Sequence, residues 1–72
     1  QGNDQDAIGF YEKCLKYPPV GKGVLYNLGI LYEDHDQYDK ATECFRRLSR
    51  ADPRDERAKL FVKDAEASLT MH

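Results

Sequence analysis

The sequence predicts an all-α fold of about four antiparallel helices, built as helix–turn–helix repeats. Three observations predict it: the chain matches itself at a shift of 34 residues, its apolar residues recur at helical spacing, and the link at residues 33–37 is short and polar. Short links place consecutive helices side by side in opposite directions. We expect one domain with three parts, a half repeat (1–21), a full repeat (22–55) and a C-terminal capping helix (56–72).

The internal match preserves the type of residue as well as its place. At a shift of 34 residues, small, apolar and turn-forming residues fall on residues of the same kind: Ala7 on Ala41, Tyr11 on Phe45, Cys14 on Leu48 and Pro19 on Pro53. A fixed period of this length is the sequence signature of helical repeats, in which each unit buries its apolar face by stacking on a neighbour.

Composition excludes several classes of protein. With 72 residues, 33% charged and 40% hydrophobic, the chain has the balance of a small globular domain rather than of a disordered or membrane-spanning segment. The longest uncharged stretch, residues 23–32, is about half the length that crosses a bilayer. A formal net charge of −2 gives no reason to expect a nucleic-acid partner. Two cysteines are too few for the disulfide framework of a small secreted domain, so we expect a cytoplasmic chain.

The full repeat has the pattern of two amphipathic helices joined by a polar link. Apolar residues lie on one face of each helix, in the first at Leu25, Leu28, Leu31 and Tyr32, and in the second at Ala41, Phe45 and Leu48. Gly29 lies inside the first helix, where a glycine costs about 1 kcal/mol relative to alanine. We expect a close approach of the second helix at Ala41 to offset this cost, because two small residues facing each other let two backbones pack tightly.

The full repeat resembles the tetratricopeptide repeat. Residues of that family's signature stand at the expected spacings: Leu28-Gly29, Tyr32, Ala41, Phe45 and Pro53. Two positions depart from the signature, because Leu25 stands in place of the Trp and Asp36 in place of the usual Gly between the helices. Aspartate adopts a left-handed backbone more readily than most residues, though less readily than glycine. The resemblance implies a non-enzymatic module that binds a peptide or a partner helix on the concave face lined by the first helix of each pair.

The resemblance also indicates which residues line this groove. They lie off the core stripe of the first helix or, in one case, on the last helix: Tyr26, Asn27, Ile30, Glu33, Asp34 and Leu60. A tyrosine offers apolar area with a polar tip, and an asparagine can bond both groups of a peptide backbone. Some members of the family hold a C-terminal carboxylate with Lys, Arg and Asn. Asn27 fits that pattern, but Tyr26 and Ile30 occupy neighbouring places and the basic residues are missing, so we exclude this function. An aromatic–aliphatic groove with an acidic edge at Glu33 and Asp34 would suit an apolar or mildly basic segment.

Residues 4–17 predict a helix with an unusually wide apolar face. Asp4 or Asp6 can cap its start, and Pro18-Pro19 ends it. Its apolar and aromatic residues spread around most of the circumference: Ala7, Ile8, Phe10, Tyr11, Cys14, Leu15 and Tyr17. A surface helix has a narrower stripe. We therefore expect a second cover, supplied by another chain or by a helix preceding Gln1 in a longer protein, since the sequence begins without Met or a signal-like stretch. This face motivates an alternative function, a structural element that forms a homo-oligomer through Ile8, Phe10, Tyr11 and Leu15.

Residues 53–69 predict the last helix. Asp52-Pro53 is a helix-start signal, and Asp55 would lie in the first turn, where it complements the helix dipole. Lys63 stands at the place of the small residue and would block another close-packed helix, so we interpret the segment as a capping helix with a polar outer side.

The stretch 46–71 is also similar to bacterial tetratricopeptide repeat proteins that carry a domain like the C-terminal domain of the RNA polymerase alpha subunit. That similarity implies a parent protein linked to transcription.

No constellation in the sequence predicts catalysis or a metal site. The polar run around His35 resembles a ligand set, but consecutive residues in a turn do not converge on one ion. We interpret Cys14 and Cys44 as packing residues rather than as a redox pair. Arginines alternate with carboxylates over residues 46–57, which favours a salt-bridged, solvated face over a phosphate site. Without paired carboxylates, a Ser-His-Asp set or a glycine-rich loop, we expect no enzyme activity and no cofactor.

Overall fold

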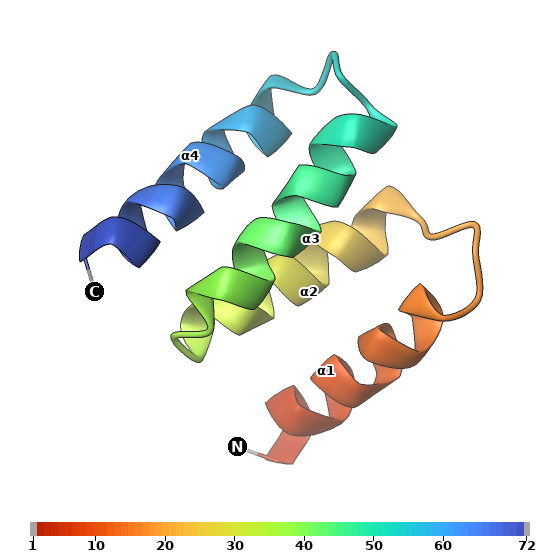
Figure 1. The fold of residues 1–72 in the computed structure, drawn as a ribbon. Helices are drawn as coiled ribbons and strands as arrows, with labels where there is room; N and C mark the ends of the chain where they lie inside the picture. Colours follow the sequence, from red (N-terminus) through yellow and green to blue (C-terminus); the bar gives the residue numbers. More distant parts are fainter. Residues whose placement is uncertain (1, 72) are drawn as a thin grey trace.

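The computed structural model describes residues 2–71, which form four helices and no strand: α1 (Gly2–Leu15), α2 (Lys22–Asp34), α3 (Tyr38–Ala51) and α4 (Glu56–Met71) (Figure 1). The predicted all-α class is therefore confirmed. The division into a half repeat, a full repeat and a capping helix stays a prediction, and its limits at Gln1 and His72 lie outside the described residues.

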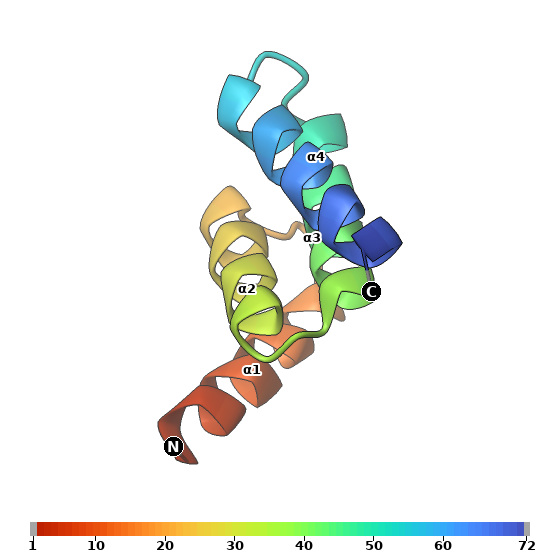
Figure 2. The ribbon, with the colours of Figure 1, turned by 90° about the vertical axis from the view of Figure 1, so that its left-hand side faces the viewer.

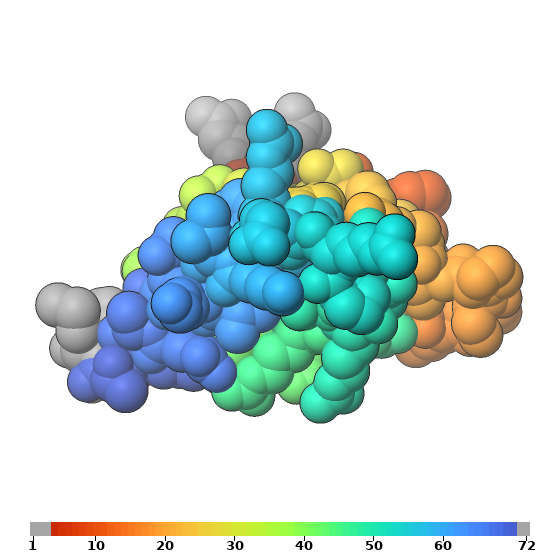
Figure 3. All heavy atoms as spheres, turned by 90° about the horizontal axis from the view of Figure 1, so that it is seen from above, coloured from red at the N-terminus to blue at the C-terminus, as the bar shows by residue number. Residues whose placement is uncertain are grey.

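Consecutive helices pack against one another: α1 on α2, α2 on α3, and α3 on α4. Helix α3 packs on both α2 and α4, so it is covered from two sides; in Figure 2 α4 lies in front of α3 and α2 stands to the left. The Cα atoms span 29 × 27 × 15 Å, which makes the stack a slab rather than a sphere. Seen from above, the link between α1 and α2 projects at one edge of this slab (Figure 3). The position of a helix in the stack thus decides how many of its faces are covered.

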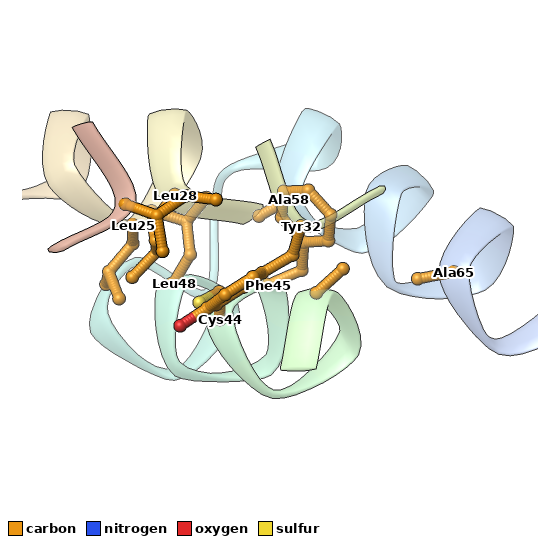
Figure 4. Packing of buried hydrophobic residues seen from close by; sticks show 10 residues of the cluster. Leu25, Leu28, Tyr32, Cys44, Phe45, Leu48, Ala58 and Ala65 are labelled. Carbon is orange, nitrogen blue, oxygen red and sulfur yellow. The ribbon is translucent and has the colours of Figure 1, made fainter. Parts of the chain in front are cut away.

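The core lies where α2, α3 and α4 meet (Figure 4). Leu28, Phe45 and Leu48 are completely buried. The ring of Phe45 stacks on that of Phe61 from α4, with the ring centroids 4.8 Å apart. The apolar stripes predicted for the two helices of the full repeat form this core, with Leu31 only partly buried at its edge.

Gly29 makes room for an aromatic ring. A Cβ atom at this position would lie 2.6 Å from Cε1 and 2.7 Å from Cζ of Phe45. The sequence predicted a close approach here, but with Ala41 as the partner; the atoms nearest to Gly29 belong to Phe45 instead. Phe45 follows Ala41 by one helical turn on the same face of α3, and its longer side chain is the one that reaches the backbone of α2.

A left-handed residue closes the link between α2 and α3. Asp36 has a φ of 61°, as expected for the residue that replaces a glycine. Its N–H donates to the carbonyl of Glu33 at 3.0 Å, and the N–H of Gln37 donates to the carbonyl of Tyr32 at 2.8 Å. This pair of bonds is the Schellman motif, which satisfies carbonyls that a helix end would otherwise leave open.

The two ends of α1 differ from the prediction. The helix begins at Gly2, so Asp4 lies in its first turn instead of capping it, and Asp6 lies further inside. It ends at Leu15, two residues before the predicted end at Tyr17. A proline disfavours the helical conformation in the residue before it, so Pro18 excludes Tyr17 from the helix.

The start of α4 also differs from the prediction. The helix begins three residues later than expected, because Asp55 caps it and Asp52 does not. Oδ1 of Asp55 accepts the N–H of Arg57 at 3.0 Å and that of Ala58 at 3.3 Å. These bonds satisfy two of the open donors at the helix start. Asp52 and Pro53 belong to a separate turn before the helix.

Candidate functional site

A groove between α2 and α4 is the candidate site. It holds a cavity of about 460 Å³, within the size range of ligand pockets. The cavity is lined by two residues of α2 and four of α4: Tyr26, Ile30, Arg57, Leu60, Phe61 and Asp64. Two of its apolar side chains are exposed to solvent, Ile30 at 39% and Leu60 at 60%. The structure thus gathers Tyr26, Ile30 and Leu60, as predicted for the groove.

Tyr26 is held as a wall of the cavity. Its hydroxyl donates to Oδ2 of Asp55 at 2.8 Å, and its ring forms a T-shaped pair with that of Phe61, with the centroids 5.7 Å apart. Burial, followed by this hydrogen bond, raises the pKa of Tyr26. The same bond is the main reason why the pKa of the Asp55 carboxyl is lowered. The polar tip of Tyr26, predicted to face a partner, is therefore used to fix α2 to the start of α4.

Carboxylates gather at the other end of the groove. Burial raises the pKa of Glu33, and the nearby charges of Asp64 and Asp34 raise it further. Asp64 lines the cavity, whereas Asp34 is exposed and does not. Neither residue of the predicted acidic edge, Glu33 or Asp34, therefore lines the cavity; the acidic lining residue is Asp64 of the facing helix, and Glu33 lies near enough to feel its charge.

Asn27 faces away from the cavity. Its Nδ2 donates to the hydroxyl of Tyr11 on α1 at 3.3 Å. One step along an α-helix turns the side chain by about 100°, so the neighbour of a groove residue points toward the preceding helix. The structure does not bring Asn27 together with Tyr26, Ile30 and Leu60.

Three lining residues were missed at the level of sequence: Arg57, Phe61 and Asp64. The repeat contains the signal that could have found them. Adding 34 to positions 23, 26, 27 and 30, which lie off the core stripe of α2, gives the four lining residues of α4: Arg57, Leu60, Phe61 and Asp64. Of the corresponding positions on α2, Tyr26 and Ile30 also line the groove, whereas Gly23 and Asn27 do not.

The predicted ion pairs of the arginine-rich stretch are largely replaced by others. Asp52 and Asp55, expected to pair with arginines, lie 2.7 and 3.4 Å from Nζ of Lys22. Arg46 pairs with Glu66 at 2.6 Å, and Arg57 lines the groove. Among the described residues, no group of three or more histidine, cysteine, aspartate or glutamate side chains could hold a metal ion.

The wide apolar face of α1 divides into an inner and an outer part. Ile8 is buried in the core, and Tyr11 and Leu15 pack against it, so these three predicted contact residues face inward. Phe10, at 64% exposure, faces outward. It belongs to a second cavity of about 390 Å³, formed with the link and the start of α2 by Phe10, Lys13, Cys14, Tyr17, Pro19, Val20, Gly21 and Val24.

The full repeat consists of α2, α3 and the turn that follows as far as Asp55. Residues 23–55 match the tetratricopeptide repeat family. Tetratricopeptide repeats generally mediate protein–protein interactions and are interaction repeats rather than enzymes. Neither the curated proteins nor the solved structures gave a match to the chain. No helix among residues 2–71 is long and apolar enough to cross a membrane.

Proposed function

We propose that the chain is a non-enzymatic protein-interaction module that holds a peptide or a partner helix in the groove between α2 and α4. The observation that carries the proposal is the cavity of about 460 Å³ whose apolar walls remain exposed. Ile30 and Leu60 stand on facing helices and could be covered by one inserted side chain. Exposed apolar surface that is concave and rimmed by charge is typical of interaction sites.

The proposed contact residues are those at the cavity, and their contributions differ. Leu60 and Ile30 would each contribute about 1–2 kcal/mol on burial, because part of each side chain is already covered. The rings of Tyr26 and Phe61 already pack on each other, and Phe61 also stacks on Phe45, so these two side chains shape the groove. Asp64 limits it at the acidic end, and Glu33, whose pKa the charge of Asp64 raises, lies near that end.

A peptide selection tests this proposal. Peptides are selected from a random displayed library on the 72-residue chain, and the affinity of the best binder is measured for Leu60→Ser. We expect a loss of about tenfold, since the variant removes apolar area from the cavity wall. Leu69→Ser is the matched control, because Leu69 lies on the same helix at 41% exposure and does not line the cavity. Equal affinity of the two variants, with helicity intact, would assign binding to another surface.

Self-association through α1 is a second candidate function. Phe10 and Tyr17 are 64% and 76% exposed beside the second cavity, which leaves an aromatic face open. An antiparallel pairing of two α1 helices centred on Phe10 would bring Lys16 of one copy toward Asp4 of the other, so opposite charges would meet. Ile8, Tyr11 and Leu15 would take part only indirectly, since they face inward.

Sedimentation equilibrium tests the second candidate. We expect a dimer at high protein concentration, and a monomer for Phe10→Ser. Leu69→Ser is again the control and should remain dimeric. A clean monomer of the unsubstituted chain at high concentration would remove this candidate.

The cellular setting is also part of the proposal. A cytoplasmic location and protein rather than nucleic-acid partners follow from the cysteine content and the net charge of −2. The link to transcription follows only from the similarity of residues 46–71 to bacterial proteins with an RNA polymerase alpha-like domain. If the chain belongs to a longer protein, the sequence after His72 tests the link: a helix-hairpin-helix pattern would support it, and further repeats would favour a plain scaffold.

A further inference from the structure

The groove has opposite charges at its two ends. Arg57 and Asp64 both line the cavity and stand seven residues apart on α4. A rise of 1.5 Å per residue separates them by about 10 Å along the helix axis. Between them lie the apolar walls formed by Ile30, Leu60 and Phe61. The cavity therefore runs from a cationic end to an anionic end across an apolar centre.

The anionic end is reinforced from α2. Glu33 follows the lining residue Ile30 by three positions, so it lies about one turn further along the same face of α2, and the charges of Asp64 and Asp34 affect it there. The negative end of the α2 dipole lies at the same place, because α2 ends at Asp34. A positive charge placed here would relieve the repulsion among these carboxylates.

Arg57 is the cation that lines the other end of the cavity, and two of the carboxylates close to it in sequence have other partners. Asp55 is already engaged by the hydroxyl of Tyr26, by the N–H groups of Arg57 and Ala58, and by Lys22. Asp52 is engaged by Lys22 at 2.7 Å. The positive end of the α4 dipole lies beside Arg57, since the helix begins at the preceding residue.

We propose that the groove selects a peptide segment with a large apolar side chain between a basic and an acidic residue, the basic residue lying at the Glu33–Asp64 end. The inference rests on the proposed function and names the chemistry of its partner. In a peptide with the polyproline II conformation, which has three residues per turn and a rise of 3.1 Å, side chains three positions apart point to the same side and lie about 9 Å apart, close to the 10 Å between Arg57 and Asp64. The charges of the partner should therefore stand about three positions apart, with the apolar side chain between them.

Four synthetic peptides of one length test the proposal. The full probe is Ser-Gly-Lys-Leu-Phe-Glu-Gly-Ser with blocked termini, labelled with fluorescein. The other three replace its Lys, its Glu or both by Gln. Fluorescence anisotropy measures their affinities for the 72-residue chain and for two variants, Glu33→Gln/Asp64→Asn and Arg57→Gln. All three substituted side chains are exposed or half-buried, so both variants should stay folded, which circular dichroism checks.

Each charge of the peptide should matter only while its partner in the groove is present. On the unsubstituted chain, losing the peptide's Lys should weaken binding about threefold to tenfold, and losing its Glu somewhat less. The preference for Lys should vanish in Glu33→Gln/Asp64→Asn, and the preference for Glu in Arg57→Gln. Both preferences should fade in high salt, as expected for charges near the surface.

The outcomes separate this inference from the function on which it rests. If the four peptides bind equally well and Leu60→Ser weakens all of them, the charge selection is wrong and the groove function stands. The same holds if none of the four binds but the library-selected peptide does. If neither kind of peptide binds, both proposals are wrong.

Discussion

Helices α1 and α3 occupy equivalent places 34 residues apart, yet they are buried to very different degrees. Four residues on the inner face of α3 are almost completely buried: Ala41, Cys44, Phe45 and Leu48. Their counterparts on α1 are half-buried or, in the case of Phe10, exposed: Ala7, Phe10, Tyr11 and Cys14. Because the residue types are alike, the difference lies in the neighbours. Helix α3 is covered by α2 and α4, whereas α1 packs mainly on α2.

The second cavity shows what this difference leaves open. Three of its lining residues, Phe10, Cys14 and Val24, correspond at a shift of 34 to Cys44, Leu48 and Ala58. Those three are all buried in the core. On α3 the equivalent positions are covered by α2. On α1 no helix of the described chain takes the place of α2, and the cavity remains open. Burial in a stacked repeat is a property of the position in the stack, and only secondarily of the residue.

The largest expected effect is the difference between two identical truncations. Phe45→Ala should lower the free energy of unfolding by about 3–5 kcal/mol, since Phe45 is fully buried and stacks on Phe61. Phe10→Ala should change it by about 0.5 kcal/mol or less, because most of Phe10 is exposed. Urea unfolding followed by circular dichroism measures both. Similar losses in the two variants would show that α1 has a cover in solution, and would overturn the comparison.

The two cysteines should differ in reactivity as the two helices differ in burial, with Cys44 of α3 less reactive than Cys14 of α1. Burial raises the pKa of Cys44 to about 11, about two units above its ordinary value. At pH 8 the thiolate fraction of Cys44 should therefore be about a hundredfold smaller than that of a thiol with the ordinary pKa. Cys14 is only half-buried and lines the second cavity. A chromogenic disulfide reagent should therefore titrate one thiol in the folded chain and both in denaturant. Cys14→Ser should abolish the fast reaction, and Cys44→Ser should keep it. Equal rates would contradict the assigned burial.

The smallest expected effect concerns two glycines in helices. Replacing each by alanine should change the stability of the chain in opposite directions. Gly29→Ala places a Cβ 2.6 Å from the ring of Phe45 and should cost about 1–3 kcal/mol. At Gly9 in α1 a Cβ would meet no atom within 4 Å. Gly9→Ala should therefore stabilise the chain by about 0.5–1 kcal/mol through helix propensity. Thermal melts measure both changes, and stabilisation by Gly29→Ala would refute the close contact between α2 and α3.

Much of the fold could be predicted from the sequence, because its signals act over a few residues. The apolar stripes depend on a period of 3.6 residues, and the left-handed place of Asp36 depends on the bonds of one helix end. Local sequence signals could not decide whether Asp52 or Asp55 caps the start of α4. Both precede a helix-compatible stretch, and Pro53 favoured the wrong one.

The candidate site was predicted only in part. Tyr26, Ile30 and Leu60 line the cavity, whereas Asn27, Glu33 and Asp34 do not. The facing residues of α4 become visible only when the period of 34 is applied to the groove as well as to the core.

The sequence by itself determined the helices, their apolar faces and the period that stacks them, because these depend on interactions between residues within about four positions of one another. The tertiary structure decided the rest. It brought Tyr26 to Asp55, 29 residues away, and it set Glu33 near Asp64. It also decided that Phe45 and not Ala41 lies against Gly29. Such pairs are fixed by how whole helices pack, which depends on side-chain volumes meeting across an interface and not on the local pattern of either helix.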